Sequence, residues 1–500
     1  MNQKIKLCPN KLVRHIGKPQ KEFKKEDIIR YIQENGIRMV NFMYPAGDHR
    51  LKTLNFVINS EEYLDSILTF GERVDGSSLF PFIEAGNSDL YVLPRFSTAF
   101  EDPFAPIPTV TMLATFFDKD GQPLASSPDN TLRKAAASFT KLTGLEFYAM
   151  GELEYYVVAE DPGLFQATDQ KGYHESAPFA KFNDFRTRCM DYIAQAGGQI
   201  KYGHNEVGNF TLDNKIYEQN EIEFIPVEAS DAADQLMIAK WVIRNLALKE
   251  QLDVTFAPKI TSGKAGSGLH IHFKLMKDGK NMMSENGLLT DDAKKAIVGI
   301  LELSPAITAF GNKVPTSYLR LVPHQEAPTN ICWGARNRSV LVRVPLGWTG
   351  KGDMCRIANP LEDAVDYIAP QKQTVELRSS DSSGDIYQLI AGMIMAARYG
   401  FEMKDALKRA DELFVSVNIH SDENQEKIKQ LNSLPDSCAA SADALIELRD
   451  YFETEDVFSP DMIDGIVKRL RKYNDRNLRD KVNNSPAAMQ ELVHKYWHCG

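Results

Sequence analysis

Apolar residues recur along the chain with two periods, and each period predicts one kind of element. Apolar and polar residues alternate in short runs, as in strands with one buried face, at residues 39–44, 51–57, 89–94, 151–158 and 269–275. Helical spacing predicts helices at residues 27–36, 127–143, 236–246, 293–303 and 386–407, and over most of the chain from 441 onward. Strands and helices are mixed without an internal repeat, so the pattern predicts an α+β protein.

The strand predicted at residues 151–158 carries two carboxylates, Glu152 and Glu154, among apolar and aromatic residues. Side chains alternate faces along a strand, so both carboxylates point the same way. Two acids on one face of a buried strand repel each other, and burial raises the cost of their charge. A cation is the natural compensation, so the strand predicts a metal site.

The same two-residue spacing recurs in three other strand-like segments, with the pairs Glu221 and Glu223, His270 and His272, and Glu376 and Arg378. We expect these strands to converge. Carboxylates with one imidazole suit Mg²⁺ or Mn²⁺ better than zinc, and such ions bring phosphates together, which indicates a nucleotide substrate. The competing interpretations are a solvated strand face for each pair and a hydrogen-bonded structural role for each histidine.

Two arginine-rich segments, residues 320–328 and 335–343, place guanidinium groups beside apolar residues. Arginine is always charged and grips a carboxylate or phosphate with two parallel hydrogen bonds. Semi-buried arginines near a metal site therefore favour an anionic substrate. For any single arginine, a salt bridge to a surface acid is the commoner role.

The composition limits the classes of partner. The 500 residues are 43% hydrophobic and 25% charged, which is typical of a globular protein with a sizeable core. The net charge of −10, without a long basic block, argues against nucleic-acid and anionic-membrane binding. The six cysteines are scattered and no signal peptide precedes them, which favours the cytoplasm, and no apolar run is long enough to span a membrane.

Several short motifs occur in an order that resembles glutamine synthetases of the bacterial type I class. They are DGSS at 75–78, GELEYYVV at 151–158, HNEV at 204–207, QNE at 219–221, GSGLHIH at 266–272, RLVPHQEAP at 320–328, NRS at 337–339 and VELR at 375–378. Each motif alone is weak, but the ordered set is specific to the family.

The resemblance implies an α+β fold with a small N-terminal β-grasp domain and a larger catalytic domain, whose curved antiparallel sheet is flanked by helices. We expect a loosely attached arm at residues 1–25, the β-grasp domain at 26–120, and the catalytic domain with a helical C-terminal region at 121–500. The resemblance also implies a ring-shaped homo-oligomer, commonly two stacked hexamers, in which a neighbour's small domain completes each active site. The implied reaction joins ammonia to the γ-carboxylate of L-glutamate through a γ-glutamyl phosphate, and it yields glutamine, ADP and phosphate from ATP.

By position, the resemblance assigns six ligands for two Mg²⁺ or Mn²⁺ ions: Glu154, Glu206 and Glu221 for one, and Glu152, His270 and Glu376 for the other. It assigns glutamate binding to Arg320, Arg378 and the backbone near Gly266. The nucleotide phosphates would face Arg338, Arg343 and His272. Glu326 would close over the site, and with Arg338 and the small-domain acid Asp75 it completes the catalytic set.

The sequence departs from the family pattern at Tyr44, where the family has an aspartate that binds ammonium and takes its proton. A tyrosine supplies neither a negative charge nor a base at neutral pH. Asn432 occupies the place of the tyrosine that some members adenylylate, which argues against that modification. The alternatives are γ-glutamylation of a larger amine such as a polyamine or ethanolamine, a non-catalytic scaffold, and a metal-dependent hydrolase that uses His270 and His272.

Overall fold

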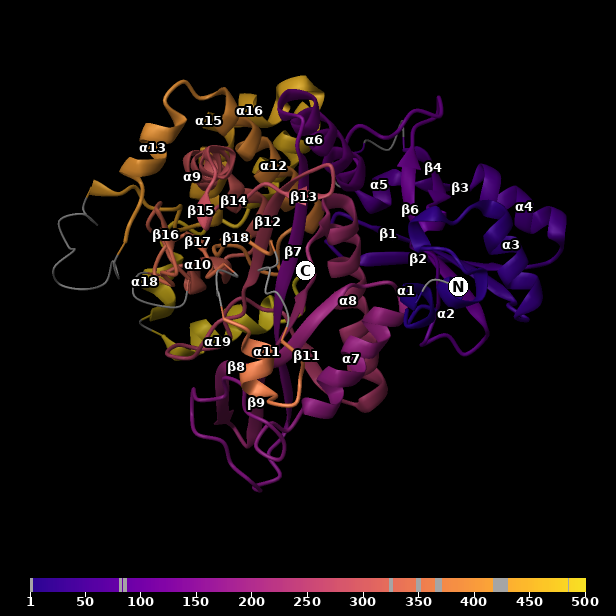
Figure 1. Ribbon diagram of the computed structural model, residues 1–500, viewed down its shortest axis with the longest axis horizontal. Coiled ribbons are helices and arrows are strands. Elements are labelled where there is room, and N and C mark those ends of the chain that lie inside the picture. The colour runs from indigo at the N-terminus through magenta and orange to yellow at the C-terminus, as the bar shows by residue number, and fades with distance from the viewer. Residues whose placement is uncertain are drawn as a thin grey trace.

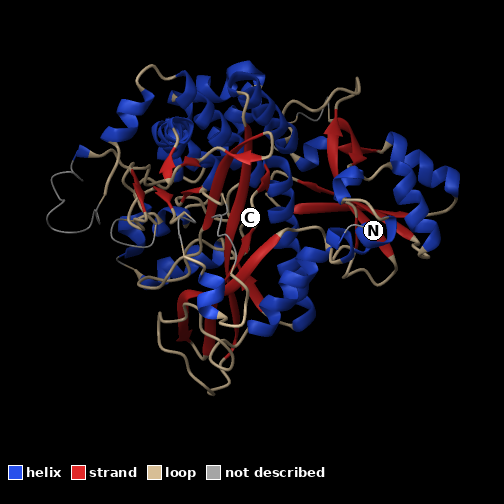
Figure 2. Cartoon of the chain, in the orientation of Figure 1, coloured by secondary structure: helices blue, strands red, loops and turns tan. Residues whose placement is uncertain are grey.

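The computed structural model describes residues 3–80, 83, 88–322, 327–347, 352–364, 371–416, 430–483 and 485–500. The chain forms a small N-terminal unit and a larger unit, which lie side by side in Figure 1. Each unit combines a sheet with helices that pack against it (Figure 2), so the α+β prediction is confirmed. Among the described helices, none combines the length and the apolar character needed to cross a membrane.

The small unit is built on a mixed sheet whose central strands run parallel. Its strands are β1 (Met39–Pro45), β2 (Leu51–Val57), β3 (Glu72–Asp75), β4 (Asp89–Pro94), β5 (Phe100–Glu101) and β6 (Thr109–Phe117). The order is β2-β1-β6-β4-β3, with β1 parallel to β6 and β5 paired to β6. Helices α3 (Lys25–Glu34) and α4 (Glu61–Phe70) share its core, and α5 (Gly76–Leu79) and η3 (Phe96–Thr98) lie in connections. This arrangement confirms the expected β-grasp fold.

The N-terminal segment packs onto the small unit instead of hanging loose. It forms α1 (Gln3–Lys6), α2 (Lys11–Ile16) and η1 (Gln20–Glu22). Leu12, Val13 and Phe23 are buried in the core of the small unit. The expectation of a loosely attached arm at 1–25 is therefore wrong for residues 11–23, because these apolar side chains find a hydrophobic surface that the local pattern does not reveal. The domain boundaries drawn from the sequence stay a prediction.

The larger unit contains a sheet of ten described strands, in which β7 (Glu146–Glu160) is long and central. The main path is β16-β17-β18-β12-β7-β9-β8, and its pairs are antiparallel except the parallel β16–β17 pair. The other strands are β8 (Ile200–Leu212), β9 (Lys215–Phe224), β10 (Val227–Glu228), β11 (Asp253–Thr255), β12 (Leu269–Lys277), β13 (Lys280–Asn281), β16 (Trp333–Ala335), β17 (Val342–Val344) and β18 (Val375–Leu377). A separate hairpin pairs β14 (Ser284–Glu285) with β15 (Leu288–Leu289).

Long helices pack against this sheet and supply most of the core. They are α6 (Pro128–Thr143), α7 (Asn183–Gln195), α8 (Ala229–Glu250), α9 (Asp291–Gly311) and α12 (Ile386–Glu402). Helix α6 begins with Pro128 and ends before Gly144, which has a φ of 70°, as its end signals predict. Helices α9 and α12 cross closely at Gly299 and Gly400, so their backbones are in contact.

Shorter helices complete the outer part of the larger unit. They are α10 (Ser317–Arg320), α11 (Met354–Ala358), α13 (Ala406–Glu412), α15 (Cys438–Glu447), α16 (Arg449–Glu453), η5 (Thr454–Asp456), α17 (Pro460–Arg471), α18 (Leu478–Asn483) and α19 (Pro486–Lys495). Helices α15 and α17 pack against α9 and bury Leu445, Met462 and Ile463 in the main core. The prediction of a helical C-terminal region is confirmed.

Candidate functional site

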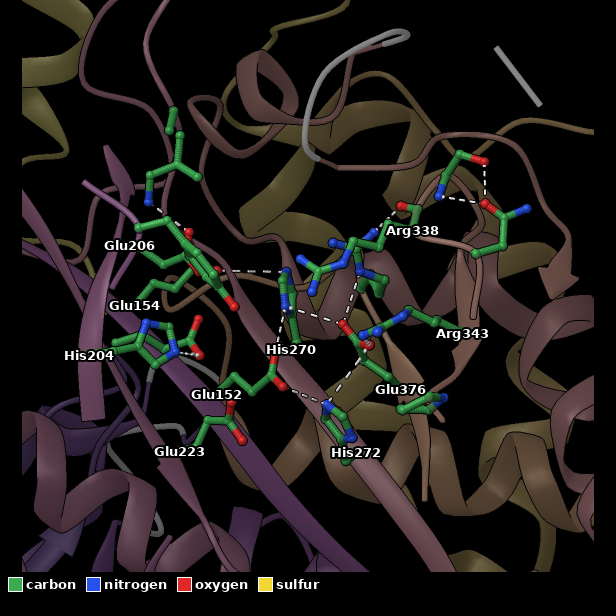
Figure 3. A pocket seen from close by; sticks show the side chains of 18 of the residues that line it. Glu152, Glu154, His204, Glu206, Glu223, His270, His272, Arg338, Arg343 and Glu376 are labelled. Atoms are coloured by element: carbon green, nitrogen blue, oxygen red, sulfur yellow. Dashed lines mark hydrogen bonds and ion pairs between the residues drawn. The ribbon is translucent and has the colours of Figure 1, made fainter. Parts of the chain in front are cut away.

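A cavity of about 810 Å³ opens over one face of the large sheet. Six strands, β8, β9, β7, β12, β18 and β17, supply many of its polar side chains, and helix α10 and several connections supply others. The labelled side chains point toward one another in Figure 3. The four pairs of residues that the sequence predicted to converge all line this cavity, on strands that are direct neighbours. Strand pairing therefore brings together residues that are far apart in the sequence.

Glu152, His270 and Glu376 form a compact cluster of possible ligands. Glu152 on β7 and His270 on β12 are direct partners across the ladder. The Nδ1 atom of His270 lies 3.0 Å from Glu152 Oε2 and 3.4 Å from Glu376 Oε1. One donor atom from each of the three residues lies within 4.8 Å of the other two. One ion can span donors at this spacing.

His272 lies on the same face of β12 as His270 and contacts the same carboxylate. Its Nε2 atom lies 2.8 Å from Glu152 Oε1, and its Nδ1 atom lies 3.0 Å from Thr374 Oγ1. Glu152 is thus held between two imidazoles. Burial would raise the pKa of Glu152, but His272 and His270 outweigh burial and hold that pKa well below its ordinary range.

Glu154, Glu206 and Glu221, the ligands expected for the second ion, all line the cavity. Glu154 Oε2 accepts hydrogen bonds from Gln219 Nε2 at 2.9 Å and from the Gly268 N–H at 2.7 Å. Glu206 Oε2 accepts one from the Val207 N–H at 2.7 Å. These three carboxylates do not form a compact donor group in the described chain, where Glu221 instead groups with His204 and Glu223.

Glu221 lies with His204 and Glu223, which were not among the expected ligands. The Nε2 atom of His204 is 3.3 Å from Glu221 Oε1. Strand alternation was the signal available in the sequence, since His204 precedes Glu206 by two residues and Glu223 follows Glu221 by two. The two-residue spacing predicts that Glu221 and Glu223 share one strand face, but it gives no role for Glu223.

Several carboxyl groups crowd the β8–β9 side of the cavity. Burial, together with Glu152 and Glu154, raises the pKa of Glu221 well above its ordinary range. Burial and the nearby Glu154 raise the pKa of Glu206 to about 7. A divalent cation would relieve both effects by supplying the missing positive charge. The donors are carboxylate oxygens and imidazole nitrogens, so the residues present fit Mg²⁺ or Mn²⁺.

Five arginines line the cavity, and two of them share one carboxylate. Arg343 Nη1 and Arg378 Nε donate to the two oxygens of Glu376, each at 2.9 Å. Arg338 is exposed, and its carbonyl accepts a hydrogen bond from Arg378. Glu376 therefore fixes two guanidinium groups at the cavity wall.

Arg320 is the most deeply buried of the five, with 1% of its surface exposed. It donates to the carbonyl oxygens of Ser379 and Ser380 at 3.0 and 3.2 Å, and its Nη2 lies 3.2 Å from His270 Nε2. Gly266 packs beside it, since a Cβ there would lie 2.4 Å from the Pro258 carbonyl oxygen and 3.1 Å from Arg320 Cγ. A glycine is therefore needed for the loop to lie against this arginine.

Two expected or noted residues, Asp75 and Tyr44, are not among the described residues that line the cavity. Asp75 is exposed on the small unit and accepts hydrogen bonds from the hydroxyls of Ser77 and Ser78 at 2.7 and 2.6 Å. Tyr44 is 4% exposed and packs against Phe116 in the small core, with ring centroids 5.1 Å apart. Glu326 lies outside the described residues.

Two family profiles match the chain. Residues 36–119 match the profile described as "Glutamine synthetase, beta-Grasp domain", and residues 125–488 match "Glutamine synthetase, catalytic domain". A glutamine synthetase of Frankia alni is 30% identical over 495 residues, which covers 91% of this chain and 97% of that protein. One from Pyrococcus horikoshii is also 30% identical, with 76% of this chain and 78% of that protein covered.

Solved structures share the fold at lower sequence identity. Glutamine synthetase of Plasmodium falciparum has a TM-score of 0.73 at 18% identity, with 91% of this chain and 97% of that chain covered. A GmaS complex with ADP has a TM-score of 0.69 at 17% identity, with 91% and 96% covered. Because the two profiles together span most of its length and the fold agrees, the chain belongs to the glutamine synthetase family.

Proposed function

We propose that this protein is a cytoplasmic ligase that uses ATP to join ammonia to the γ-carboxylate of L-glutamate, giving glutamine, ADP and phosphate. The observation that carries the proposal is the cluster of Glu152, His270 and Glu376 in a cavity whose wall also presents arginines. Carboxylate-bound divalent ions neutralise the charge of a transferred phosphoryl group, and fixed guanidinium groups hold its anionic partners. Both features suit the transfer of a phosphoryl group to a carboxylate.

The proposed roles divide the cavity into three regions. Mg²⁺ or Mn²⁺, when bound, would supply charge neutralisation to the phosphates of ATP. The ligands would be Glu152, His270 and Glu376 for one ion, and Glu154, Glu206 and Glu221 for the other. Arg338, Arg343 and His272 would contact the phosphates, and Arg320, Arg378 and the Gly266 backbone would bind glutamate.

Orientation of the substrates and stabilisation of charge by the fixed arginines would raise the rate. Exclusion of water would protect the γ-glutamyl phosphate from hydrolysis. The buried Arg320 and the paired Arg343 and Arg378 are held before substrate arrives, so little reorganisation is needed on binding. We further propose a ring-shaped homo-oligomer, commonly a double hexamer in this family, in which a neighbour's Asp75 reaches the cavity. Glu326 would cover the site.

Tyr44 and Asp48 of the small unit bear on which amine the protein uses. Tyr44 is buried against Phe116, and burial raises the pKa of its hydroxyl, so it offers no carboxylate to an ammonium ion. Asp48, the nearest acid in sequence, is ion-paired with Lys52 at 2.6 Å. These contacts keep a larger amine, such as a polyamine or ethanolamine, as the second candidate substrate.

One assay tests the proposal and separates these candidates. Phosphate release from Mg²⁺-ATP and glutamate is measured with ammonium, putrescine, ethanolamine or no added amine. We expect saturable release that depends on ammonium. Release that saturates only with a larger amine would assign the protein to that substrate, and no release with any amine would leave a non-catalytic scaffold.

A further inference from the structure

Strand β8 is irregular at the point where Glu206 reaches the cavity. It pairs with β9 at Asn205 and again from Asn209, but the three residues between them, 206–208, lie opposite the single residue Gln219. Such a bulge redirects a side chain, and bulges are common beside active sites. Because Glu206, labelled in Figure 3, lies inside the bulge, pairing with β9 does not by itself fix its position.

Helix α7 contacts this strand pair through Arg186, which is 5% exposed. Arg186 Nη1 donates to the side-chain oxygens of Asn205 on β8 and Asn220 on β9, the second at 2.7 Å. These asparagines are direct partners across the ladder, and each immediately precedes a proposed ligand, Glu206 or Glu221. We propose that Arg186 is a positioning residue, which holds these two glutamates at the cavity by fixing the strand pair next to the bulge. The inference rests on their proposed role as ligands.

The two asparagines are buried on the face of the strands that turns away from the cavity. Glu221 lines the cavity, so its neighbour Asn220 points to the opposite face, where α7 packs. Asn205 and Asn220 are both 0% exposed, so their amide oxygens need a partner from the protein. A guanidinium nitrogen carries two hydrogens, and Nη1 can therefore serve both amides at once.

The contacts of Arg186 favour a role in geometry over a role in stability. Its Nη2 donates to Asn183 Oδ1 at 2.8 Å, which ties the guanidinium to the first turn of its own helix. Within the part of the chain that the structure describes, its hydrogen bonds go to amide oxygens and no ion pair joins it. A buried charge held only by neutral acceptors costs free energy of folding, but it orients its partners.

The far end of the bulge is attached to the same helix. Glu218, which pairs with Asn209 after the bulge, is 0% exposed. Its carboxylate accepts hydrogen bonds from the N–H groups of Lys181 at 2.7 Å and Phe182 at 3.1 Å, immediately before α7 begins. One helix therefore holds β8 and β9 on both sides of the bulge.

The segment at the outer edge of β8 offers a competing explanation. The N–H groups of Gly172 and His174 donate to the carbonyl oxygens of Val207 and Asn205 at 3.2 and 3.0 Å. If these backbone bonds alone fixed Glu206, changes at Arg186 would leave the binding of metal ions unaltered. The two explanations therefore predict different results.

The experiment compares Arg186→Lys with a control on the same helix. Lysine keeps the charge, but its ammonium lacks the planar fork that contacts both amides. Arg188→Gln is the control, because the Arg188 side chain is 52% exposed and pairs with Glu250 at 2.6 Å. Two quantities are measured on the purified full-length protein without substrates: Mn²⁺ binding by equilibrium dialysis, and hydrogen–deuterium exchange of residues 206–209. Glu206→Gln and Glu376→Gln identify the two classes of Mn²⁺ site.

We expect Arg186→Lys to weaken the class that depends on Glu206 by at least about tenfold, as loss of a residue that orients a ligand does. Exchange at 206–209 should be faster, and the class that depends on Glu376 should be unchanged. Arg188→Gln should change neither quantity. Asn183→Ala, which removes the bond that orients the guanidinium, should act in the same direction and replaces Arg186→Lys if that variant does not fold.

Unchanged Mn²⁺ binding and exchange in folded Arg186→Lys would overturn the inference in favour of the edge segment. Equal weakening of both classes with a lower thermal midpoint would also overturn it, because a general loss of stability does not select one class. A wild type that binds Mn²⁺ without ligating any amine would contradict the proposed reaction and leave this inference standing. Absence of the Glu206 class in the wild type would refute the proposed ligands, and exchange at 206–209 would then decide whether Arg186 anchors the bulge.

Discussion

His49 of the small unit and Asp385 at the start of α12 form a buried contact between the two units, with Nδ1 3.3 Å from Oδ2. Asp385 also accepts a hydrogen bond from the Gln388 N–H at 3.0 Å, which caps α12. Burial would raise its pKa, but His49 and the nearby Lys313 outweigh burial and lower it to about 2. Asp385 therefore caps α12 and also contacts the small unit.

We expect Asp385→Asn to destabilise the protein at pH 7 by about 2 kcal/mol, because the amide keeps the cap but loses the charge that faces His49 and Lys313. The folded pKa lies below the unfolded value, so this stability is present above about pH 4 and is lost as the pH falls through 2. Thermal midpoints of the variant and the wild type should therefore converge at low pH. Asp405→Asn is the control, since Asp405 precedes α13 without a side-chain cap bond. Equal thermal midpoints of Asp385→Asn and the wild type at pH 7 would contradict a stabilising role for the Asp385 charge.

The crossing of α9 and α12 depends on two glycines. A Cβ at Gly400 would lie 1.9 Å from the Lys295 carbonyl oxygen, and one at Gly299 would lie 2.1 Å from the Ala396 carbonyl oxygen. Alanine normally stabilises a helix relative to glycine, but here it forces the two backbones apart. We expect Gly400→Ala to cost about 1–3 kcal/mol, measured by urea denaturation. Gly352→Ala, where the nearest atom is 4.0 Å away, should be tolerated.

Glu154 is the central residue of the proposed second ion site. We expect Glu154→Gln to lower turnover by at least about 100-fold, because it removes a ligand charge where phosphoryl charge develops. The amide oxygen still accepts the hydrogen bonds of Gln219 and Gly268, so the fold and the thermal midpoint should be retained. Glu160→Gln, at the exposed end of the same strand, is the matched control. Near-normal turnover in Glu154→Gln would refute the role in metal binding.

Glu228 caps α8 by accepting a hydrogen bond from the Ser230 N–H at 3.1 Å. Burial and the nearby Asp231 raise its pKa to about 6. The raised folded pKa means that this group stabilises the protein below its unfolded pKa and loses that contribution as the pH rises through 6. We expect Glu228→Gln, which stays neutral, to be more stable than the wild type by about 2 kcal/mol at pH 7.5. The difference should vanish near pH 4.5, and thermal midpoints at both pH values would show whether it does.

The sequence by itself determined where helices begin and end and on which face of a strand a side chain lies. The Pro128 and Gly144 signals marked the ends of α6, because proline and glycine restrict or permit particular backbone angles. The two-residue spacing of Glu152 and Glu154 placed them on one strand face, and the ordered motifs identified the family before any contact was known.

The tertiary structure alone decided which faces meet and which segments are covered. The partnerships of Glu152 with His270 and Glu223 depend on strand order and register, to which residues far apart in the sequence contribute. The pairing of β8 with β9 likewise places Glu221 beside His204 and Glu223. Burial of Leu12 and Val13 depends on the surface of the small unit, which a short amphipathic segment does not encode. A local pattern specifies which way a side chain points, but its neighbours are set by long-range packing.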